Sequence, residues 1–476
     1  MFINREKELE ALSSAYKDSK AQFIVIYGKR RVGKTEIVKQ FFKSIPHIYF
    51  LADKAPEKEQ LSLLSEKVGL LYKDQFLLSR GFGNWHDFFT YIKDKGRVVL
   101  AIDEFPFLIE ANRAVPSIFQ KGWDEGLKDS GIFLILLGSS IGMMETDVLG
   151  YKSPLFGRRT GQLLIEPLSF WHAKKFFPRI SDEDFMYIYS VLGGTPAYLL
   201  QFDPAADLWT NIRKKIFASN AYLFSEPEFI LKEELREPRN YFSIIRAISM
   251  GKARAGEIIN ETGFEKNVVG KYLSVLTDLR IVKREVPVTE KSCEKSKKGI
   301  YMLDDNYFRF WFKYVFPNKS FIEEGETDYV IKNKIRPELD IFVSQTYEEV
   351  CRSYVRKGLP SAGSFGKGMK FNSERVSATS RFDKIGRWWT KDAEIDIVGI
   401  NEDDNAILFG EAKWSGKPVG VNILNELKAK AEEVQWGNSK TSKHFALFSR
   451  KGFTSEMLKL AKREKVLLFR GIEKVG

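Results

Sequence analysis

Three uninterrupted apolar runs, at residues 23–27, 98–102 and 132–137, mark the first third of the chain. Runs of this kind are typical of strands buried on both faces of a parallel sheet. Residues 36–42, shortly after the first run, have the spacing of an amphipathic helix. This alternation of strand and helix predicts an α/β domain with a parallel sheet.

The middle of the chain changes to helical patterns. Residues from about 162 to 230 have amphipathic spacing interrupted by prolines, which predicts a small helical lid. Further helices are predicted at 241–248, 255–260 and 267–276, and short strands at 281–286 and 299–303 follow them. Helices followed by a two-stranded wing predict a winged helix-turn-helix.

The last third contains two strand patterns, at 394–400 and 407–413, separated by the turn-like residues 401–405. The pattern predicts a hairpin. In its second strand Glu411 and Lys413 interrupt an apolar run. Because side chains at i and i+2 share one face of a strand, this acid and this base point the same way.

Composition limits the classes of protein. Of the 476 residues, 43% are hydrophobic and 29% are charged, which fits folded domains and, at this length, about three of them. The absence of an apolar run of about 18 residues argues against a membrane span. The N-terminus has no signal-peptide pattern, so we expect a cytoplasmic protein without membrane contact. Two cysteines and four scattered histidines give neither a disulfide framework nor a zinc site.

The net charge is +12, and much of it lies in the last part of the chain. From Ala412 to the end there are fourteen Lys or Arg residues against six Asp or Glu. A basic excess favours a polyanionic partner, because contacts to phosphates release counterions. The alternative is a solvated basic surface without a partner.

The first apolar run leads into a phosphate-binding motif. The segment matches G-x-x-x-x-G-K-[ST] between a strand and a helix, the context that this motif requires; its residues are Gly28, Lys29, Arg30, Arg31, Val32, Gly33, Lys34 and Thr35. Its backbone N–H groups are expected to surround phosphates, with Lys34 at the β/γ oxygens and Thr35 on Mg²⁺. The motif therefore predicts an ATP site.

The ends of the next two strands supply further polar residues. Asp103 and Glu104 follow the second run, where Asp103 is predicted to hold the magnesium shell and Glu104 to orient the attacking water. Ser139, after the third run, suits a contact to the γ-phosphate. Arg158 and Arg159 are candidates for an arginine finger, with simple surface exposure as the alternative.

These motifs resemble a known family. The opening FINRE, the loop GKRRVGKT, the strand end DEF, LGSS, SPLFGRRT and GGTP together are similar to the archaeal/prokaryotic ATPases of the STAND branch of AAA+ proteins. The resemblance implies a P-loop AAA+ core, with Asn4 and Arg5 near the adenine. It also implies that residues 194–196, ending in Pro196, form the nucleotide-sensing turn of the lid.

The predicted hairpin of the last third brings a second set of acids together. Asp396 on the first strand and Glu411 on the second are expected to converge on one Mg²⁺ or Mn²⁺ ion, since hard cations prefer carboxylate oxygens. Lys413 is then placed to activate water or to stabilise charge on a scissile phosphate. A salt-bridged strand pair without catalysis is the alternative for an isolated E-x-K.

Asp396 and E-x-K on adjacent strands resemble the PD-(D/E)xK nuclease fold. The segments IGRWW, EIDIV, FGEAKW and FSRKGF are similar to the DUF234-type domain of unassigned function that accompanies these ATPases. The resemblance implies a restriction-endonuclease-like α/β domain, and a further acid from a preceding helix. Glu348 and Glu349 both qualify, and the resemblance favours Glu348. No proline precedes Asp396, which departs from the family pattern and leaves cleavage open.

The expected domains are an ATPase core at 1–160, a lid at 161–232, a winged helix at 233–318 and a nuclease-like domain at 319–476. DNA is the expected partner. Its predicted contacts lie on the third helix and the wing, at Asn267, Lys271, Lys291, Lys297 and Lys298. The competing interpretation is a signalling or scaffold ATPase whose winged helix and nuclease-like domain bind protein, including a nucleotide-dependent homo-oligomer.

Overall fold

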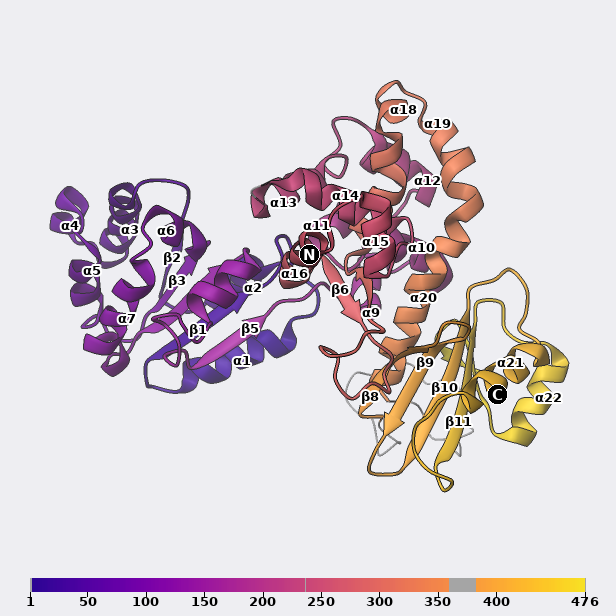
Figure 1. Cartoon of the computed structure of the whole chain (residues 1–476). Coiled ribbons are helices and arrows are strands. Elements are labelled where there is room, and N and C mark those ends of the chain that lie inside the picture. The colour runs from indigo at the N-terminus through magenta and orange to yellow at the C-terminus, as the bar shows by residue number, and fades with distance from the viewer. Residues whose placement is uncertain (1, 236, 359–381, 476) are drawn as a thin grey trace. The chain divides into compact units, whose positions relative to one another are not determined.

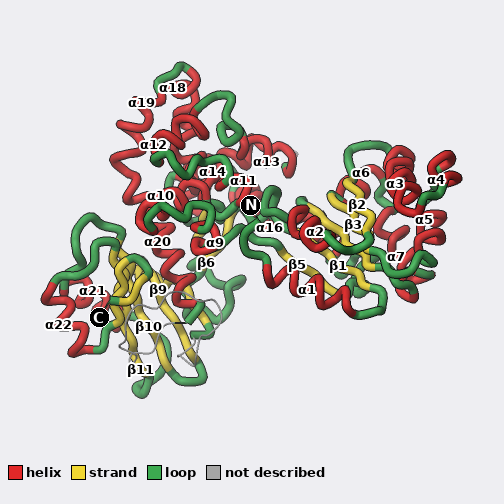
Figure 2. The backbone as a smooth tube through the Cα atoms, turned by 180° about the vertical axis from the view of Figure 1, so that it is seen from behind, coloured by secondary structure: helices red, strands yellow, loops and turns green. Residues whose placement is uncertain are grey.

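The structure is a computed structural model, and it describes residues 2–235, 237–358 and 382–475. The chain divides into two compact units. Unit 1 consists of residues 1–175 and 194–200, and unit 2 consists of residues 176–193 and 201–476. Figure 1 and Figure 2 follow the elements of each unit from opposite sides. Within the described ranges, no helix is long and apolar enough to cross a membrane.

Unit 1 alternates strands and helices as the apolar runs predict. Its strands are β1 (Gln22–Tyr27), β2 (His47–Leu51), β3 (Val99–Asp103), β4 (Phe133–Gly138) and β5 (Gly161–Leu164). Its helices are α1 (Glu6–Lys17), α2 (Lys34–Phe42), α3 (Glu57–Tyr72), α4 (Gln75–Arg80), α5 (Trp85–Ile92), α6 (Phe105–Ala111), α7 (Val115–Glu125), α8 (Ile141–Met143), α9 (Phe170–Lys174) and α11 (Pro196–Leu199).

The five strands form one parallel sheet in the order β2-β3-β4-β1-β5. Its two faces have separate cores, because β1, β3 and β4 are buried on both sides. Leu12 of α1 and Ile37 of α2 pack on one face, whereas Phe88 of α5 and Phe119 of α7 pack on the other. The parallel α/β sheet is confirmed, and the carboxyl ends of its strands meet at one edge.

The predicted helical pattern from residue 161 is wrong at its start. Residues 161–164 are β5, which pairs in parallel with β1. The Thr160 hydroxyl accepts a hydrogen bond from Phe23 N–H at 2.9 Å, and the Thr160 N–H donates to Phe23 O at 2.8 Å. These bonds between distant segments hold the backbone in an extended conformation, although the side chains of this segment do not show the pattern of a strand.

Unit 2 begins with helices and ends with a sheet. Its helices are α10 (Asp182–Leu192), α12 (Leu208–Asn211), α13 (Glu226–Glu234), α14 (Pro238–Ser249), α15 (Ala255–Thr262), α16 (Lys266–Asp278), α17 (Asn306–Phe310), α18 (Lys319–Glu323), α19 (Thr327–Val330), α20 (Leu339–Arg356), α21 (Val421–Glu432) and α22 (Ser455–Glu464). Its strands are β6 (Val282–Glu285), β7 (Ile300–Leu303), β8 (Lys384–Trp389), β9 (Glu394–Asn401), β10 (Ala406–Lys413), β11 (Ser442–Ser449), β12 (Leu467–Arg470) and β13 (Glu473–Lys474).

The helices and the strand pair on which the winged helix-turn-helix prediction depends are present in unit 2. Helices α14, α15 and α16 pack on one another, and β6 pairs with β7 in an antiparallel ladder. Val269, Leu273 and Leu276 form the buried face of α16. The aromatic segment after β7 belongs to the core, because Phe308 and Trp311 are buried.

The C-terminal part of unit 2 is a mixed six-stranded sheet in the order β13-β12-β11-β10-β9-β8. Strands β8, β9 and β10 are antiparallel neighbours, and β11 then runs parallel to β10. The predicted hairpin of β9 and β10 is confirmed, with Ile397 opposite Gly410. Continuing this register places residue 396 beside residue 411 on one face. Helix α20 packs against β8, β9 and β10.

Candidate nucleotide and cation sites

The phosphate loop is held in shape by the backbone of a neighbouring segment. Gly28 has a φ of +152°, and a Cβ atom there would lie 2.2 Å from the carbonyl oxygen of Ile165. Gly33 has a φ of +95° and immediately precedes α2. Only glycine adopts both conformations without strain or collision. The predicted residues from Gly28 to Thr35 therefore form a loop that leads from the buried β1 into α2.

Lys34, Thr35 and Asp103 lie together at the end of the sheet. The Lys34 side chain is buried, and its Nζ donates to the carbonyl oxygens of Gly28 and Lys29, each at 2.9 Å. The Thr35 hydroxyl donates to Asp103 Oδ2 at 2.6 Å. A hydroxyl and a carboxylate in contact are the oxygen donors that Mg²⁺ uses in P-loop sites. The donor set thus fits a magnesium ion bound with nucleotide.

Tyr49 of β2 is a member of this site that sequence reasoning missed. Its hydroxyl donates to Asp103 Oδ2 at 2.7 Å. Burial, and then the hydrogen bond to Asp103, raise the pKa of Tyr49 well above its usual value. The phenol therefore stays protonated and holds Asp103 in place. No strand was predicted at residues 47–51, so nothing in the sequence indicated that Tyr49 would lie beside β3.

Glu104 and Ser139 contact each other, although 35 residues separate them. The Ser139 hydroxyl donates to Glu104 Oε1, and the Ser139 N–H donates to Glu104 Oε2 at 3.2 Å. Glu104 has a φ of +54°, a left-handed conformation that is rare for a side-chain-bearing residue. Strain of this kind concentrates at functional sites. Two residues chosen for separate roles thus form one polar pair beyond β3 and β4.

Arg5 contacts the phosphate loop directly. Its side chain is buried, and its Nη2 donates to the carbonyl oxygens of Val32 at 3.1 Å and Glu166 at 2.7 Å. Asn4, beside it, has a φ of +58°. Pro196 is the first residue of α11. Arg5 therefore links the N-terminus of unit 1 to the loop, and an adenine contact by Asn4 or Arg5 stays a prediction.

The two adjacent arginines differ in their contacts. Arg158 forms an ion pair with Asp124, with Nη2 at 2.7 Å from Oδ2, and its Nη1 donates to Pro154 O at 2.9 Å. Arg159 lies over the Phe156 ring at 5.9 Å. Arg158 is thus paired with an acid within unit 1, and Arg159 Nη1 donates to Leu149 O at 3.5 Å. An arginine-finger role for either residue stays a prediction.

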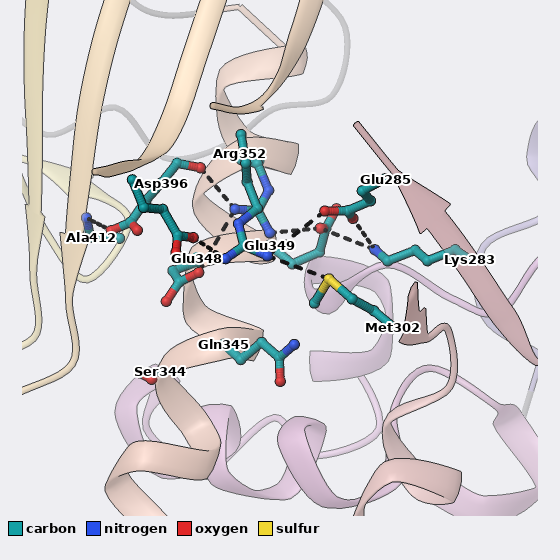
Figure 3. A network of polar contacts seen from close by, with 12 residues as sticks. Lys283, Glu285, Met302, Ser344, Gln345, Glu348, Glu349, Arg352, Asp396 and Ala412 are labelled. Carbon is teal, nitrogen blue, oxygen red and sulfur yellow. Dashed lines mark hydrogen bonds and ion pairs between the residues drawn. The ribbon is translucent and has the colours of Figure 1, made fainter. Parts of the chain in front are cut away.

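The second cluster lies in unit 2, where α20, β9 and β10 meet (Figure 3). Asp396 and Glu411 are both buried. Asp396 Oδ2 accepts a hydrogen bond from Ala412 N–H at 2.9 Å. Lys413 Nζ lies 2.6 Å from Glu411 Oε1, and Glu411 Oε2 is a buried oxygen without a hydrogen-bond partner among the described residues. The predicted convergence of these strands therefore brings acid and base together.

The electrostatics of this cluster show carboxylates that resist ionisation. Burial, followed by the charge of Glu411, raises the pKa of Asp396 to about 6. Burial, followed by the charge of Asp396, raises the pKa of Glu348 to about 8. The Glu411 carboxylate raises the pKa of Lys413 despite its burial. Acids held near one another in this way are typical of functional sites and favour a cation between them.

Glu348 and Glu349 have different surroundings. Burial acts to raise the pKa of Glu349, but Arg352, Lys283 and Arg356 outweigh it and lower that pKa well below its usual range. Glu349 Oε2 lies 2.9 Å from Arg352 Nη2. Glu349 is therefore a paired structural anion, whereas Glu348 shares the field of Asp396. This contrast favours Glu348 over Glu349 as the third acid, as the resemblance implies.

The exposed surface of the winged helix includes the predicted DNA contacts. Asn267 and Lys271 are exposed on α16, and Lys291 and Lys297 are exposed in the wing. Lys298 is also exposed, but its Nζ lies 2.9 Å from Glu290 Oε1. The base of the wing is bound to the sheet, because Val288 N–H donates to Arg387 O of β8 at 2.9 Å.

Comparison with known proteins follows the same division. Residues 2–202 match a family described as an ATPase domain predominantly from Archaea, and residues 311–431 match one described as archaeal and bacterial proteins of unknown function. An uncharacterized protein of Methanocaldococcus jannaschii is 36% identical over 453 residues, which cover 95% of this chain and 96% of that protein. This chain belongs to the family of archaeal ATPases that residues 2–202 match. A second M. jannaschii protein, named as ATP-binding, is 48% identical over 44 residues, 9% of this archaeal ATPase and 75% of that protein.

Two solved structures are similar to this archaeal ATPase at low identity. The Walker-type ATPase PABY2304 of Pyrococcus abyssi is 19% identical, with a TM-score of 0.47, over 65% of this chain and 96% of that one. The ORC2 protein of Aeropyrum pernix, in ADPNP and ADP complexes, is 13% identical, with a TM-score of 0.43, over 68% of this chain and 94% of that one. Likenesses of this size say nothing about what the archaeal ATPase binds.

In the described part of this archaeal ATPase, no three His, Cys, Asp or Glu side chains form a ready-made metal site. At the acid cluster, the positive charge comes from lysines. Besides Lys413, Lys430 of α21 lies with its Nζ 3.5 Å from Glu411 Oε1. Sequence reasoning missed Lys430, because nothing in an exposed amphipathic helix shows which strand it covers. Both lysines contact Glu411 Oε1, whereas Glu411 Oε2 has no hydrogen-bond partner among the described residues.

Proposed function

We propose that this archaeal ATPase is a Mg²⁺-dependent, ATP-hydrolysing switch that binds DNA through unit 2 and cleaves it at a cation site. The observation that carries the proposal is the pair of buried acids Asp396 and Glu411 beside the partly exposed Lys413, because a nucleotide switch alone does not require it. Unpaired buried carboxylate oxygens are costly, and proteins keep them mainly where a ligand satisfies them.

In unit 1, the proposed chemistry is phosphoryl transfer to water. Lys34 would contact the β/γ-phosphates, and Thr35 and Asp103 would hold Mg²⁺, which offsets the charge of the transferred phosphoryl group. Glu104 would orient the attacking water, and the Ser139 hydroxyl at hydrogen-bond distance from it keeps that carboxylate in position. An arginine finger from a second copy, at Arg159, would make hydrolysis depend on a nucleotide-dependent homo-oligomer.

In unit 2, Asp396 and Glu411 would hold Mg²⁺ or Mn²⁺, with Glu348 as the further acid. The oxygen donors suit these hard cations. When bound, such an ion polarises a scissile phosphate and lowers the pKa of an attacking water. Lys413, released from Glu411, would orient that water or stabilise the phosphate charge. Raised pKa values of Asp396 and Glu348 support the fit, since a cation relieves the repulsion between these acids.

DNA is the proposed substrate because two features of unit 2 suit it. Exposed Asn267 and Lys271 on α16 face away from the helical core, as a recognition helix requires, and the wing carries exposed lysines. The domain boundaries proposed from the sequence, at 160, 232 and 318, assign both features to the winged helix.

A second candidate function is a signalling or scaffold ATPase with an inactive nuclease-like domain. One observation favours it. The wing is bound at its base to β8, through Val288 and Arg387, so the winged helix is engaged with a protein surface. In that case the acid cluster would serve as an ion-paired structural feature, and a protein would be the partner.

The test is a cleavage assay on linear and supercoiled DNA in Mg²⁺ or Mn²⁺, with ATP, ADP or neither. We expect cleavage by the unmodified protein and a loss of about 100-fold or more in Asp396→Asn, the size of effect seen when a catalytic group is removed. The matched control is Asp403→Asn, an exposed acid in the turn of the same hairpin, which should cleave normally. Cleavage that persists in Asp396→Asn would refute this cation site, and the absence of cleavage under every condition would support the signalling role.

A further inference from the structure

A row of alternating charges runs between the winged helix and the acid cluster (Figure 3). It begins at Lys283 of β6, whose Nζ lies 3.0 Å from Glu285 Oε1 and 3.4 Å from Glu349 Oε2. Glu349 belongs to α20, which packs against β9 and β10. A strand of the wing is therefore joined by an ion pair to the helix beside the acid cluster.

The row continues through Arg352, one turn further along α20. Its Nη2 donates to Glu349 Oε2 at 2.9 Å, and its Nη1 donates to the backbone oxygen of Asp396 at 2.8 Å. Arg352 is only 2% exposed, so it depends on these acceptors for its hydrogen bonds. Glu349 is thus paired with two basic side chains. Lys283 belongs to the wing, and Arg352 holds the backbone of Asp396, a proposed ligand of the metal ion.

Arg352 holds Asp396 through the backbone oxygen of that residue. Its bond to the carbonyl oxygen of Asp396 sets the orientation of that peptide, and the side chain of the same residue accepts from Ala412 N–H. Glu348 Oε2 is a further 3.9 Å neighbour of Arg352. A shift of Arg352 therefore moves the backbone beneath Asp396 and changes the charge beside Glu348.

A second path strengthens the connection. Arg387 of β8 lies 3.9 Å from Glu285, and its Nη1 donates to the sulfur of Met302 on β7 at 3.4 Å. The backbone bond from Val288 to Arg387 attaches the base of the wing to the same strand. Both strands of the wing are therefore tied to β8, whose neighbour β9 carries Asp396. These contacts give a second connection from the wing, through β8, to the strand that carries Asp396.

We propose that the series Lys283, Glu349 and Arg352 couples DNA binding at the winged helix to cation binding at Asp396 and Glu411, with Arg352 as a positioning residue. The proposal rests on the proposed function, because it requires both ligands. DNA bound to the wing moves β6, which changes how strongly Lys283 pairs with Glu349. The ion pair between Glu349 and Arg352 then changes as well, and Arg352 shifts the backbone of Asp396. Coupling of this kind is reciprocal, so the cation also changes the affinity for DNA.

The test measures binding and needs no cleavage. Mn²⁺ is titrated into the full chain without nucleotide, with and without a DNA duplex, and bound ion is followed by electron paramagnetic resonance. The signal lost in Asp396→Asn is assigned to the acid cluster. We expect DNA to change that Mn²⁺ dissociation constant by about 5-fold or more, the lower end of typical coupling. In Lys283→Met, Mn²⁺ should still bind, but the ratio of its dissociation constants with and without DNA should be close to one.

Three comparisons separate coupling from a structural ion pair. Lys443→Met is the matched control, since Lys443 is an exposed lysine paired with Glu432 at 2.8 Å in the same unit and its loss removes the same charge. This variant should leave the ratio of the Mn²⁺ dissociation constants with and without DNA unchanged. Lys283→Arg should restore the ratio, and Glu349→Gln should remove it if Lys283→Met does not fold.

The outcomes are distinct. An unchanged ratio in folded Lys283→Met, or no effect of DNA on Mn²⁺ binding in the unmodified protein, overturns the coupling and leaves the proposed cation site intact. Absence of any Mn²⁺ signal that depends on Asp396, or of DNA binding, overturns the proposed function and the coupling together.

Discussion

At the residue scale, contacts within unit 1 hold the predicted phosphate loop. Gly28 lies against the backbone of Ile165, and Arg5 bonds to Val32 in the same loop. Lys34 bonds to the backbone of the loop that it follows. These contacts hold the loop that joins β1 to α2.

Gly28→Ala tests this packing. The new Cβ would lie 2.2 Å from a backbone oxygen. We expect overpacking to cost about 1–3 kcal/mol in the free energy of unfolding, and ATP affinity to fall because the loop must shift. Thermal unfolding and nucleotide titration measure the two effects. Gly157→Ala is the control, because Gly157 has a φ of +77° with no atom near its Cβ position. Equal losses in both variants would attribute the effect to backbone strain alone.

At the element scale, α10 is attached to the C-terminal sheet by charge. Glu183 in the first turn of α10 pairs with Arg450 and Lys451, each at 2.8 Å, just after β11. The Arg450 guanidinium also lies 5.0 Å from the Trp414 ring. Two segments more than 260 residues apart in sequence are thus joined within unit 2. Their contact brings α10 against the sheet that carries the acid cluster.

The pH dependence of Glu183 follows from its partners. Burial acts to raise the pKa of Glu183, but Lys451 and Arg450 outweigh it and lower that pKa below the ordinary value of 4.5. A lowered carboxylate pKa contributes stability above the unfolded value, and this stability is lost as pH falls through the folded one. Glu183→Gln should therefore lower the unfolding temperature at pH 7 and approach that of the unmodified protein below about pH 4.

Thermal unfolding at a series of pH values provides the measurement. Glu426→Gln is the matched control, since Glu426 is an exposed acid of α21 in the same unit, and its effect should be small at every pH. A Glu183→Gln deficit that is the same at pH 7 and pH 4 would show that packing, and not the ion pairs, is what the substitution disturbs.

At the scale of the whole molecule, the chain combines two units that each contain one proposed site. The ATPase family match covers residues 2–202, and the second family match covers 311–431. The relative from M. jannaschii shares both, since the similarity covers 95% of this chain. The two sites therefore occur in one polypeptide, and a nucleotide switch that acts on unit 2 gives that arrangement a function.

Lys34→Ala tests the switch. Removing the ammonium should abolish ATP binding and, with it, any difference in DNA affinity between ATP, ADP and no nucleotide. The nucleotide-free DNA affinity should stay unchanged, because Lys34 lies in unit 1 and the proposed DNA contacts lie in unit 2. Fluorescence anisotropy with labelled DNA measures this at one fixed salt concentration, since such affinities depend steeply on salt. Lys39→Ala, an exposed lysine of α2, is the control. A nucleotide effect that survives in Lys34→Ala would contradict the switch.

Much of this arrangement could be predicted from local patterns. Continuous apolar runs are sufficient to predict β1, β3 and β4, because a strand buried on both faces has no polar position to spare. The phosphate loop requires glycine at fixed positions, and the pattern of Glu411 and Lys413 within an apolar strand already indicates a site. Helices α14 to α16 and the two wing strands follow from side-chain spacing alone.

The sequence by itself thus determined the strands buried on both faces, helices α14 to α16, the two wing strands, the phosphate loop and the residues that share a face of one strand. Tertiary structure alone decided which distant residues meet: Tyr49 with Asp103, Lys430 with Glu411, and Arg352 with the backbone of Asp396. It also separated Glu348 from Glu349, which are adjacent in sequence but face different charges. The physical reason is that periodicity reports the burial of each position, whereas a partner depends on the order of strands and on which helix covers them.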